Sequence, residues 1–266
     1  NRSDEIGQLA ASVNELSAAL DTALTDLKAT NEKLKSDIEL ERQLDVMRRG
    51  FVANVSHELK TPIAIISGYA EGLKLNINAE SREEYCNTII DESRRMNKLV
   101  LSILELSRYE SGQIPLNIES FDVSQLCDDM ISRIFKAKKI TAENLIPKGT
   151  FISADPLQTE QVLKAYLENA AAHTPENGTV KTECKAENGI IRISVFNSGS
   201  HIDEKDMPQI WQSFYRGDTS HKRDSSRFGL GLSIVSAIMK LHGHKCGVYN
   251  TEDGVCFWFE ADSGEK

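Results

Sequence analysis

The chain has 266 residues, of which 40% are hydrophobic and 27% charged, with a formal net charge of -9. This length allows one large domain or two of moderate size, and the composition excludes a wholly disordered chain, a collagen and a disulfide scaffold. The acidic balance argues against non-specific nucleic-acid binding, which requires a basic surface. Five cysteines stand singly without CxxC spacing, so we interpret them as reduced structural thiols of a cytoplasmic chain. We expect neither a membrane span nor a signal peptide, because no apolar run approaches about 18–20 residues.

The first 44 residues carry an apolar seam at the spacing of a long helix. Leu9, Val13, Leu16 and Leu20 are separated by steps of three or four residues, which keeps them on one stripe. The segment has no proline, and its one glycine is at position 7. Because a sustained stripe of this kind is typical of coiled coils, we predict a signalling coiled coil over residues 1–44.

A helical hairpin is predicted over residues 45–112. Its two periodic segments, 44–75 and 82–109, are separated by a polar turn in which Ser81 is a suitable N-cap. Pro115 prevents the second helix from continuing. The apolar faces are too broad for one partner, so the pattern predicts dimerisation into a four-helix bundle.

Beyond a linker at residues 113–117, short β-type runs alternate with helical ones. Asn188-Gly189 between two such runs is a strong hairpin-turn signal. Strands and helices mixed in this way indicate one α+β domain over residues 118–266, and the whole chain is therefore classed as an α+β multidomain protein. The expected strands are 116–123, 179–185, 190–196, 246–249 and 255–259, and the expected helices are 124–135, 156–173 and 230–241.

His57 is the first candidate for chemistry, in the helical stretch SHELKTP. A neutral imidazole is a good nucleophile near neutral pH, and the Glu58 carboxylate could take the proton from one ring nitrogen while the other attacks phosphorus. Thr61 lies on the same helical face as His57, and Pro62 removes a backbone donor beside it. Taken alone, the pattern is more typical of a solvent-exposed histidine in a helix.

Asn169 and two glycine-bearing segments are the next candidates. An Asn carbonyl oxygen is a ligand that Mg²⁺ accepts together with waters and nucleotide phosphates. Asn197-Ser198-Gly199 ends a strand, and FGLGL at 228–232 opens a helix whose free N–H groups suit a phosphate. Neither segment fits the dinucleotide fingerprint or the lysine-bearing phosphate loop. For each motif alone, a helix-interior asparagine or an ordinary turn is the plainer interpretation.

Between the two glycine segments lies a polar stretch, residues 213–227, rich in basic residues such as Arg216. A long aperiodic loop in a compact domain is usually a functional lid or disordered. Its positive charge in an acidic chain favours an anionic ligand, with a solvated surface loop as the alternative. His201, His242 and His244 lack ligand spacing and are predicted to be structural.

In their order and spacing, these segments resemble the sensor histidine kinases of bacterial two-component systems. The resemblance covers nearly the whole chain, and DEIGQLAASVNEL at 4–16 is similar to the last helix of a HAMP signalling module. The matching motifs are Phe51–Pro62 (FVANVSHELKTP) for the phosphoacceptor H box, Gln161–Thr174 (QVLKAYLENAAAHT) for the N box, Val195–Glu204 (VFNSGSHIDE) for the first glycine box, Ile210–Arg216 (IWQSFYR) for the F box and Gly229–Val235 (GLGLSIV) for the second glycine box.

The resemblance implies a division of labour. The hairpin would be the dimerisation and histidine phosphotransfer domain, in which His57 takes the γ-phosphate of ATP, Glu58 acts as general base, and Thr61 orients a water that dephosphorylates the response regulator. The α+β domain would be a Bergerat-type α/β sandwich that binds ATP, with Asn169 coordinating Mg²⁺. The implied nucleotide-binding residues are Asn169, His173, Asn197, Gly199, Arg216, Gly229, Leu230 and Gly231.

Partners and location are implied as well. A homodimer would pass its phosphoryl group to an Asp of a cognate response regulator, with no nucleic-acid partner. The chain would be the cytoplasmic portion of a sensor protein that upstream segments anchor in the cell membrane.

Several positions depart from the family pattern. Asn197 replaces an Asp whose carboxylate accepts from the adenine amino group; an amide oxygen can accept the same bond, and its NH₂ could donate to the ring. Ala165 and Ala172 replace an Asn and a Lys of the N box, and His173 replaces a Tyr. None of these changes removes a core catalytic group, so the sequence predicts an active kinase.

Three other functions stay open. An ATPase of the gyrase, chaperone and mismatch-repair group would share the glycine loops, but it would carry a water-activating Glu where Ala165 stands. A coiled-coil scaffold with a degenerate nucleotide domain is the non-enzymatic alternative, disfavoured by the intact Asn169 and His57. A phosphatase-dominant member would use the same Glu58 and Thr61.

Overall fold

The computed structural model describes residues 5–112, 114–215 and 228–265. The chain divides into two units, residues 1–57 and residues 58–266. The first unit is helical throughout its described part, and the second contains the rest of the hairpin and the mixed domain.

One helix, α1 (Glu5–Lys74), joins the predicted coiled-coil segment to the first half of the predicted hairpin without a break. The seam of the first unit is exposed in the single chain; Leu9, Leu16 and Leu20 keep 66%, 71% and 59% of their surface accessible. Such a stripe needs a second helix to cover it, as the coiled-coil prediction requires. In the described part of the chain, every helix lacks the long apolar stretch that a membrane span needs.

The predicted turn leads into α2 (Arg82–Glu110), after a short 3₁₀ turn, η1 (Ala79–Ser81). Asn76 and Asn78 take left-handed backbone conformations, which asparagine tolerates better than most residues. Ser81 occupies the N-cap position as expected, but its side chain makes no capping hydrogen bond, because the residues before α2 already form a helical turn. The end of α1 and the start of α2 meet through Tyr69 and Tyr85, whose rings stack edge to face at 4.9 Å.

The mixed domain is built on a seven-stranded sheet in the described part of the chain, in the order β1-β3-β7-β5-β4-β2, with β6 paired to β7. Among the strands of the described residues, only β2 and β4 run parallel to each other. Asn188 and Gly189 both have positive φ, the requirement of a tight hairpin turn, and they join β4 to β5 as predicted. The strands are β1 (Glu119–Asp122), β2 (Thr141–Asn144), β3 (Phe151–Ala154), β4 (Thr179–Glu187), β5 (Ile190–Ser198), β6 (Cys246–Asn250) and β7 (Gly254–Ser263).

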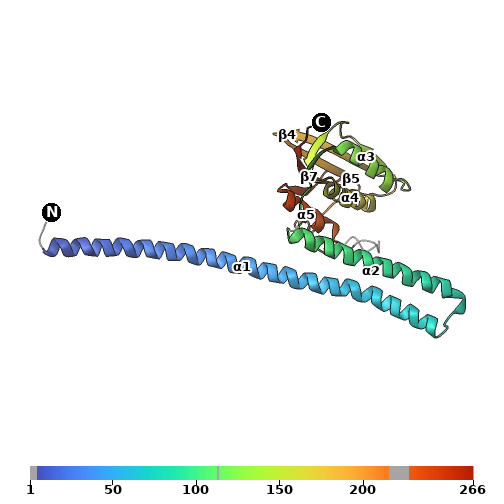
Figure 1. Cartoon of the computed structure of the whole chain (residues 1–266), viewed down its shortest axis with the longest axis horizontal. Helices are drawn as coiled ribbons and strands as arrows, with labels where there is room; N and C mark the ends of the chain where they lie inside the picture. Colours follow the sequence, from blue (N-terminus) through green and yellow to red (C-terminus); the bar gives the residue numbers. More distant parts are fainter. Residues whose placement is uncertain (1–4, 113, 216–227, 266) are drawn as a thin grey trace. The chain divides into compact units, whose positions relative to one another are not determined.

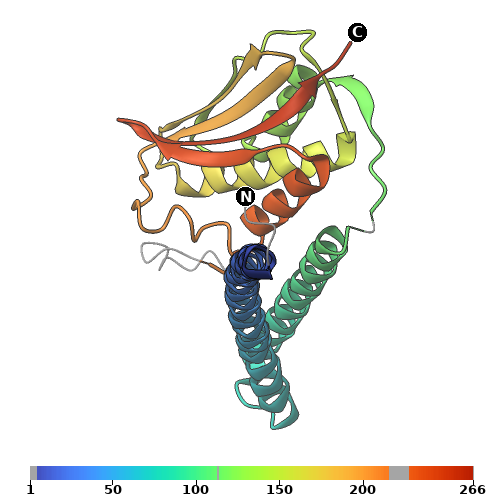
Figure 2. The ribbon, with the colours of Figure 1, turned by 90° about the vertical axis from the view of Figure 1, so that its left-hand side faces the viewer.

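Three helices form the second layer of this domain (Figures 1 and 2): α3 (Val123–Ile134), α4 (Pro156–His173) and α5 (Gly231–His242). The N-caps of α3 and α4 are Asp122 and Asp155, and each carboxylate accepts two backbone N–H bonds from the first helical turn. The core lies between helices and sheet, where Tyr166 of α4 is fully buried and packs on Phe257 and Phe259 of β7.

The helix α2 packs against α5 of the mixed domain. Leu99 and Leu106, at 0% and 2% exposure, are the buried residues of α2. At the C-terminal end of α2, the Tyr109 hydroxyl donates to Gln161 Oε1 of α4 at 2.6 Å, and Gln161 Nε2 donates to Glu105 Oε2 at 3.1 Å. Apolar burial and this polar cluster therefore both join the hairpin to the mixed domain.

Candidate functional site

The predicted phosphoacceptor residues lie on α1. His57, the last residue of the first unit, is exposed, and so is Thr61, one helical turn further along. Glu58, the first residue of the second unit, is half-buried, and its carboxylate lies 3.7 Å from the Arg95 guanidinium of α2. The exposed imidazole is open to reagents from solution.

Arg95 is a residue that the sequence analysis did not single out. Its guanidinium is also 3.6 Å from a carboxylate oxygen of Glu92, and it lies 5.5 Å from the ring centroid of Phe228, a cation–π distance. Phe228 directly precedes the glycines that open α5. One side chain thus links the residue after His57 to the second glycine segment. In the sequence, the only sign of its position was that Arg95 lies four residues before Leu99, on the same face of the helix.

One face of α4 carries three of the positions that the family pattern marked. Ala165, Asn169 and His173 follow one another at intervals of four residues, so they lie along one side of the helix. A Cβ on Gly231 would be 3.8 Å from Ala165 Cβ, which places the start of α5 against this face. Asn169 is half-buried, and its side chain makes no hydrogen bond within the described residues. His173 is exposed at the end of the helix.

The first glycine segment ends β5 beside the C-terminal end of α4. Gly199 has a φ of +79°, and a Cβ there would be 2.8 Å from the ring of Pro175, the second residue after α4. Asn197, two residues earlier, is 2% exposed, and its Nδ2 donates to Ser200 Oγ at 2.7 Å. The turn therefore requires a glycine and brings the buried Asn197 amide near the end of α4.

The second glycine segment opens α5. Gly229 has a φ of +70°, and a Cβ there would be 2.8 Å from the Tyr215 carbonyl oxygen, so a larger residue would clash with the F-box segment. The first main-chain bond of α5 runs from Ile234 N–H to the Leu230 carbonyl at 3.0 Å. The amides of Gly231 and the two residues after it therefore have no acceptor within the helix, which suits an anion.

The structure thus places Gly231 against the α4 face that carries Asn169 and His173, and Gly199 against Pro175 just after α4. Asn197 lies at the end of β5, and Gly229 and Leu230 directly precede α5. Arg216 and the remainder of the basic stretch up to residue 227 lie outside the described residues. Within the described residues, no group of three or more His, Cys, Asp or Glu side chains forms a metal cluster.

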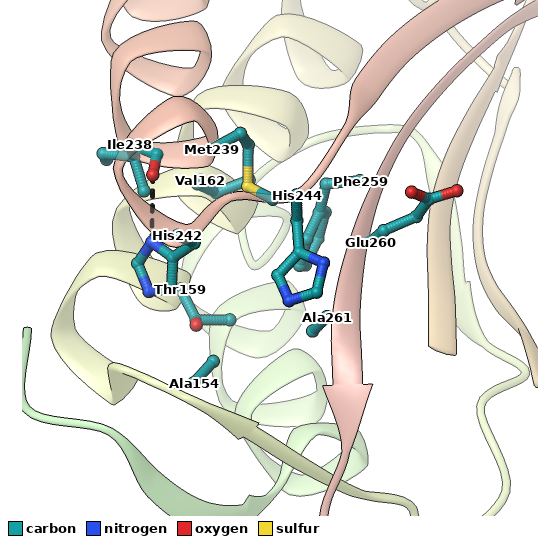
Figure 3. Close-up of a pocket in the computed structure, with 10 residues that line it drawn as sticks. All are labelled: Ala154, Thr159, Val162, Ile238, Met239, His242, His244, Phe259, Glu260 and Ala261. Carbon is teal, nitrogen blue, oxygen red and sulfur yellow. Dashed lines mark hydrogen bonds between the residues drawn. The ribbon is translucent and has the colours of Figure 1, made fainter. Parts of the chain in front are cut away.

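A small hollow lined by residues such as Thr159, Ile238 and His242 marks the opposite end of α5 (Figure 3). It is separated from the glycine-opened start of α5 by the 12 residues of that helix, about 18 Å. His242 on its wall bonds through Nδ1 to the Ile238 carbonyl at 2.9 Å, and its Nε2 accepts from Asp155 N–H at 3.4 Å. His244 lies 3.3 Å from Asp262, and His201 bonds the Thr251 carbonyl. All three histidines have bonds to the fold, as a structural role requires.

The cysteines are free thiols, as expected from the sequence, and two of them, Cys127 and Cys256, are buried. Burial in apolar surroundings raises the pKa of Cys127 to about 12, with Asp128 adding to the effect. The pKa of Cys246 rises to about 11 for the same main reason, desolvation. Protonated thiols of this kind pack as small apolar side chains.

Two family models match the chain in the order that the sequence analysis proposed. The His Kinase A (phospho-acceptor) domain matches residues 47–112, and the histidine kinase-, DNA gyrase B-, and HSP90-like ATPase matches residues 154–265. The first match contains His57, Glu58 and Thr61, and the second contains the nucleotide-site candidates.

Curated relatives and solved structures agree with these matches. The sensor protein VanSB of Enterococcus faecalis is 32% identical over 263 residues, covering 97% of this chain and 57% of that protein. The sensor histidine kinase WalK of Bacillus subtilis is 31% identical over 214 residues, 78% of this chain and 35% of that protein. The histidine kinase ThkA, solved in complex with the response regulator protein TrrA, is 28% identical with a TM-score of 0.64, covering 80% of this chain and 61% of that one.

A second solved structure, full-length ShkA in complex with AMPPNP, is 26% identical with a TM-score of 0.60, over 80% of this chain and 46% of that one. The chain spans about half the length of the curated relatives that it matches, 57% of VanSB and 48% of TcrY of Mycobacterium tuberculosis. Because both matched domains, their order and the relatives agree with the motifs and the fold, the chain belongs to the sensor histidine kinases of bacterial two-component systems.

Proposed function

We propose that this chain is an ATP-dependent protein histidine kinase that phosphorylates its own His57 and passes the phosphoryl group to an Asp of a response regulator. The observation that carries the proposal is the convergence of the Asn169 face of α4, the Asn197 end of β5 and the open N-terminus of α5 in one domain. This domain follows a helix that exposes His57.

Each element of the nucleotide site has a proposed role. The buried Asn197 amide oxygen accepts from the adenine amino group, and Gly199 lets the backbone turn beside it. The free amides at the start of α5, shaped by Gly229, Leu230 and Gly231, bind phosphate oxygens. His173 contacts the nucleotide at the end of α4. We place Arg216 in this site as a phosphate partner on charge alone.

The Asn169 side chain suits a Mg²⁺ ion, because the residue is half-buried and its side chain has no hydrogen bond within the described residues. Bound with the nucleotide, the cation would neutralise charge on the phosphates. Asn169 would hold it from the middle of the α4 face, between Ala165 and His173.

The proposed reaction is an in-line phosphoryl transfer. One ring nitrogen of His57 forms a bond to the γ-phosphorus while the bond from that phosphorus to the bridging oxygen breaks, and ADP leaves. Glu58 accepts the proton from the other ring nitrogen. The phosphoryl group then moves to a carboxylate oxygen of the response regulator, which restores His57. The relative ThkA, solved with a response regulator, supports this partner class.

We also propose that Thr61 orients a water for dephosphorylation of the regulator, that the chain acts as a homodimer, and that it is the cytoplasmic portion of a membrane-anchored sensor. Exposed apolar side chains on the hairpin, such as Leu101 and Leu104 at 51% and 52%, support dimerisation into a four-helix bundle. The proposed domains are residues 1–44, 45–112 and 118–266, with a linker at 113–117.

The test is transfer of radiolabel from γ-labelled Mg·ATP, with wild type, His57→Gln and Asn169→Ala compared. We expect label that is stable to base and labile to acid on wild type, and none on either variant. Asn87→Gln, at an exposed position of α2, is the matched control and should retain the label. Label that persists on His57→Gln would refute the choice of nucleophile.

A phosphatase-dominant or degenerate nucleotide-binding scaffold is the alternative, and Asn197 is the observation that favours it, because an uncharged amide stands at the proposed adenine position. ATP binding without label in wild type would support it. An ATP hydrolase of the gyrase type is disfavoured by Ala165, which offers no carboxylate to activate water.

A further inference from the structure

The side chains of Asn197 and Ser200 can form a hydrogen bond in either direction, with the Asn197 amide as donor or as acceptor. Asn197 is 2% exposed, its Nδ2 donates to Ser200 Oγ at 2.7 Å, and its Oδ1 accepts no hydrogen bond within the described residues. Among the described residues, the fully buried side-chain atoms without a partner are Glu92 Oε2, Arg95 Nε and Gln158 Oε1. Asn197 Oδ1 is not one of them, so it keeps some accessible surface through which it can accept from a ligand.

The backbone fixes the position of this amide but not its orientation. Asn197 lies in β5 between Val180 of β4 and Val255 of β7. A Cβ on the neighbouring Gly254 would come within 2.9 Å of the Asn197 carbonyl carbon, so β7 passes close to the Asn197 main chain at this point. Rotation of the amide by 180° exchanges two groups of nearly equal size, and it therefore needs no extra space.

Ser200 accepts both orientations. Its hydroxyl can accept from Nδ2, or it can rotate and donate to Oδ1. In the first state Asn197 offers the ligand an acceptor, and in the second it offers a donor. An Asp at position 197 would offer an acceptor only.

We propose that this site binds purine nucleoside triphosphates with either a 6-amino or a 6-oxo group, so that it discriminates weakly between ATP and ITP. The inference rests on the proposed function, because it takes Asn197 as the residue that faces the base. With ATP, Oδ1 accepts from the 6-amino group; with ITP, Nδ2 donates to the 6-oxo group while Ser200 donates to Oδ1.

The test is the ratio of the dissociation constants for ITP and ATP, measured by calorimetry with Mg²⁺ on the whole chain. For wild type we expect a ratio below about 20, since the Asn197 amide offers a complementary group to either 6-substituent. For Asn197→Asp the ratio should grow at least about tenfold, because the carboxylate and the 6-oxo oxygen would face each other as two acceptors. A larger wild-type ratio, or an unchanged ratio in Asn197→Asp, would overturn the inference.

Ser200→Ala is the matched variant for the second half of the pair. It removes the partner of both orientations equally, so both affinities should weaken and their ratio should stay within about threefold of wild type. A larger change would mean that Ser200 holds one orientation, which contradicts inversion. Circular dichroism checks that the variants fold. Wild type that binds neither nucleotide would contradict the proposed function itself, whereas ATP binding with ITP exclusion contradicts only this inference.

Discussion

At the scale of single residues, Arg95 connects positions that are far apart in the sequence. Its guanidinium faces the Glu58 and Glu92 carboxylates and the Phe228 ring, and its side chain is only 21% exposed. Its Nε is buried without a hydrogen bond among the described residues. This contact with Arg95 competes with the contact that Glu58 must make with His57 in its proposed general-base role.

We therefore expect Arg95→Ala to raise the initial rate of autophosphorylation, by about two- to fivefold given the usual strength of a partly exposed ion pair. The measurement is the rate of label incorporation at saturating ATP. Arg94→Ala is the control, because Arg94 is 74% exposed and pairs only with Asp91 of its own helix in the described part of the chain. Equal rates in both variants would mean that the Arg95 contact does not restrain Glu58.

The buried thiols give a second expectation at this scale. Desolvation raises the pKa of Cys127 to about 12, so its thiol stays protonated and unreactive at pH 8, whereas Cys86 is exposed to reagent. In the unfolded chain the Cys127 thiol has a pKa near 9.0, so it ionises at a lower pH than in the folded chain. This group therefore lowers the free energy of unfolding as the pH rises from about 9 to about 12. Alkylation with iodoacetamide at pH 8, read by mass spectrometry, should label Cys86 and spare Cys127 until denaturant is added. Early labelling of Cys127 would show that α3 opens locally.

Two glycines of the proposed nucleotide site could be singled out from the sequence because they sit in short motifs with a local physical reason. Gly199 and Gly229 both take positive φ against close neighbours, which only glycine accepts without strain. Arg95 could not be predicted, because its role depends on contacts with α1 and Phe228 that arise only when distant segments fold together. The Asn197–Ser200 hydrogen bond likewise could not be predicted from the sequence, since it depends on the turn at Gly199.

At the scale of elements, the sequence predicted the long and well-capped pieces best. α4 has the predicted bounds, Pro156–His173, because Asp155 caps its start and Pro175 follows its end. The strands β2 and β3 were missed. Each has only four residues, and β2 (TAEN) is polar and short enough to be taken for a loop. β2 is held by parallel pairing with β4, which periodicity does not reveal.

The contact between α2 and α4 yields a prediction for these elements. Tyr109→Phe removes the hydroxyl that donates to Gln161, and the loss of about 1 kcal/mol should speed amide exchange in the last turns of α2 by about fivefold. Hydrogen–deuterium exchange by mass spectrometry measures this. Tyr85→Phe is the control, since its ring stacks on Tyr69 at the other end of α2. Unchanged exchange in Tyr109→Phe would mean that Leu99 and Leu106 alone hold the helix in place.

At the scale of the whole chain, the order of helical and mixed segments was enough to predict the class of both matched domains. The 3.6-residue period of the hairpin and the alternating runs after Pro115 differ so clearly that the boundary is visible in the sequence. The packing of α2 on α5 was not predictable, because both helices bury apolar faces that fit several partners equally well until the surrounding shape selects one. The helices and domains could therefore be predicted from the sequence better than the contacts between them.

The unbroken course of α1 has a consequence for how an upstream change can reach His57. Each residue of a helix turns the next by about 100°, so every leucine of the exposed seam has a fixed angular phase relative to His57. Two residues inserted between Lys35 and Ser36 would twist that phase by about 200°, whereas seven would alter it by about 20°. We expect the two-residue insertion to change the autophosphorylation rate of the dimer and the seven-residue insertion to preserve it. Equal rates in the two insertion variants would mean that a rotation of the upstream helix does not reach His57. If the phase is preserved, the signal that reaches His57 is a rotation of the helix about its own axis.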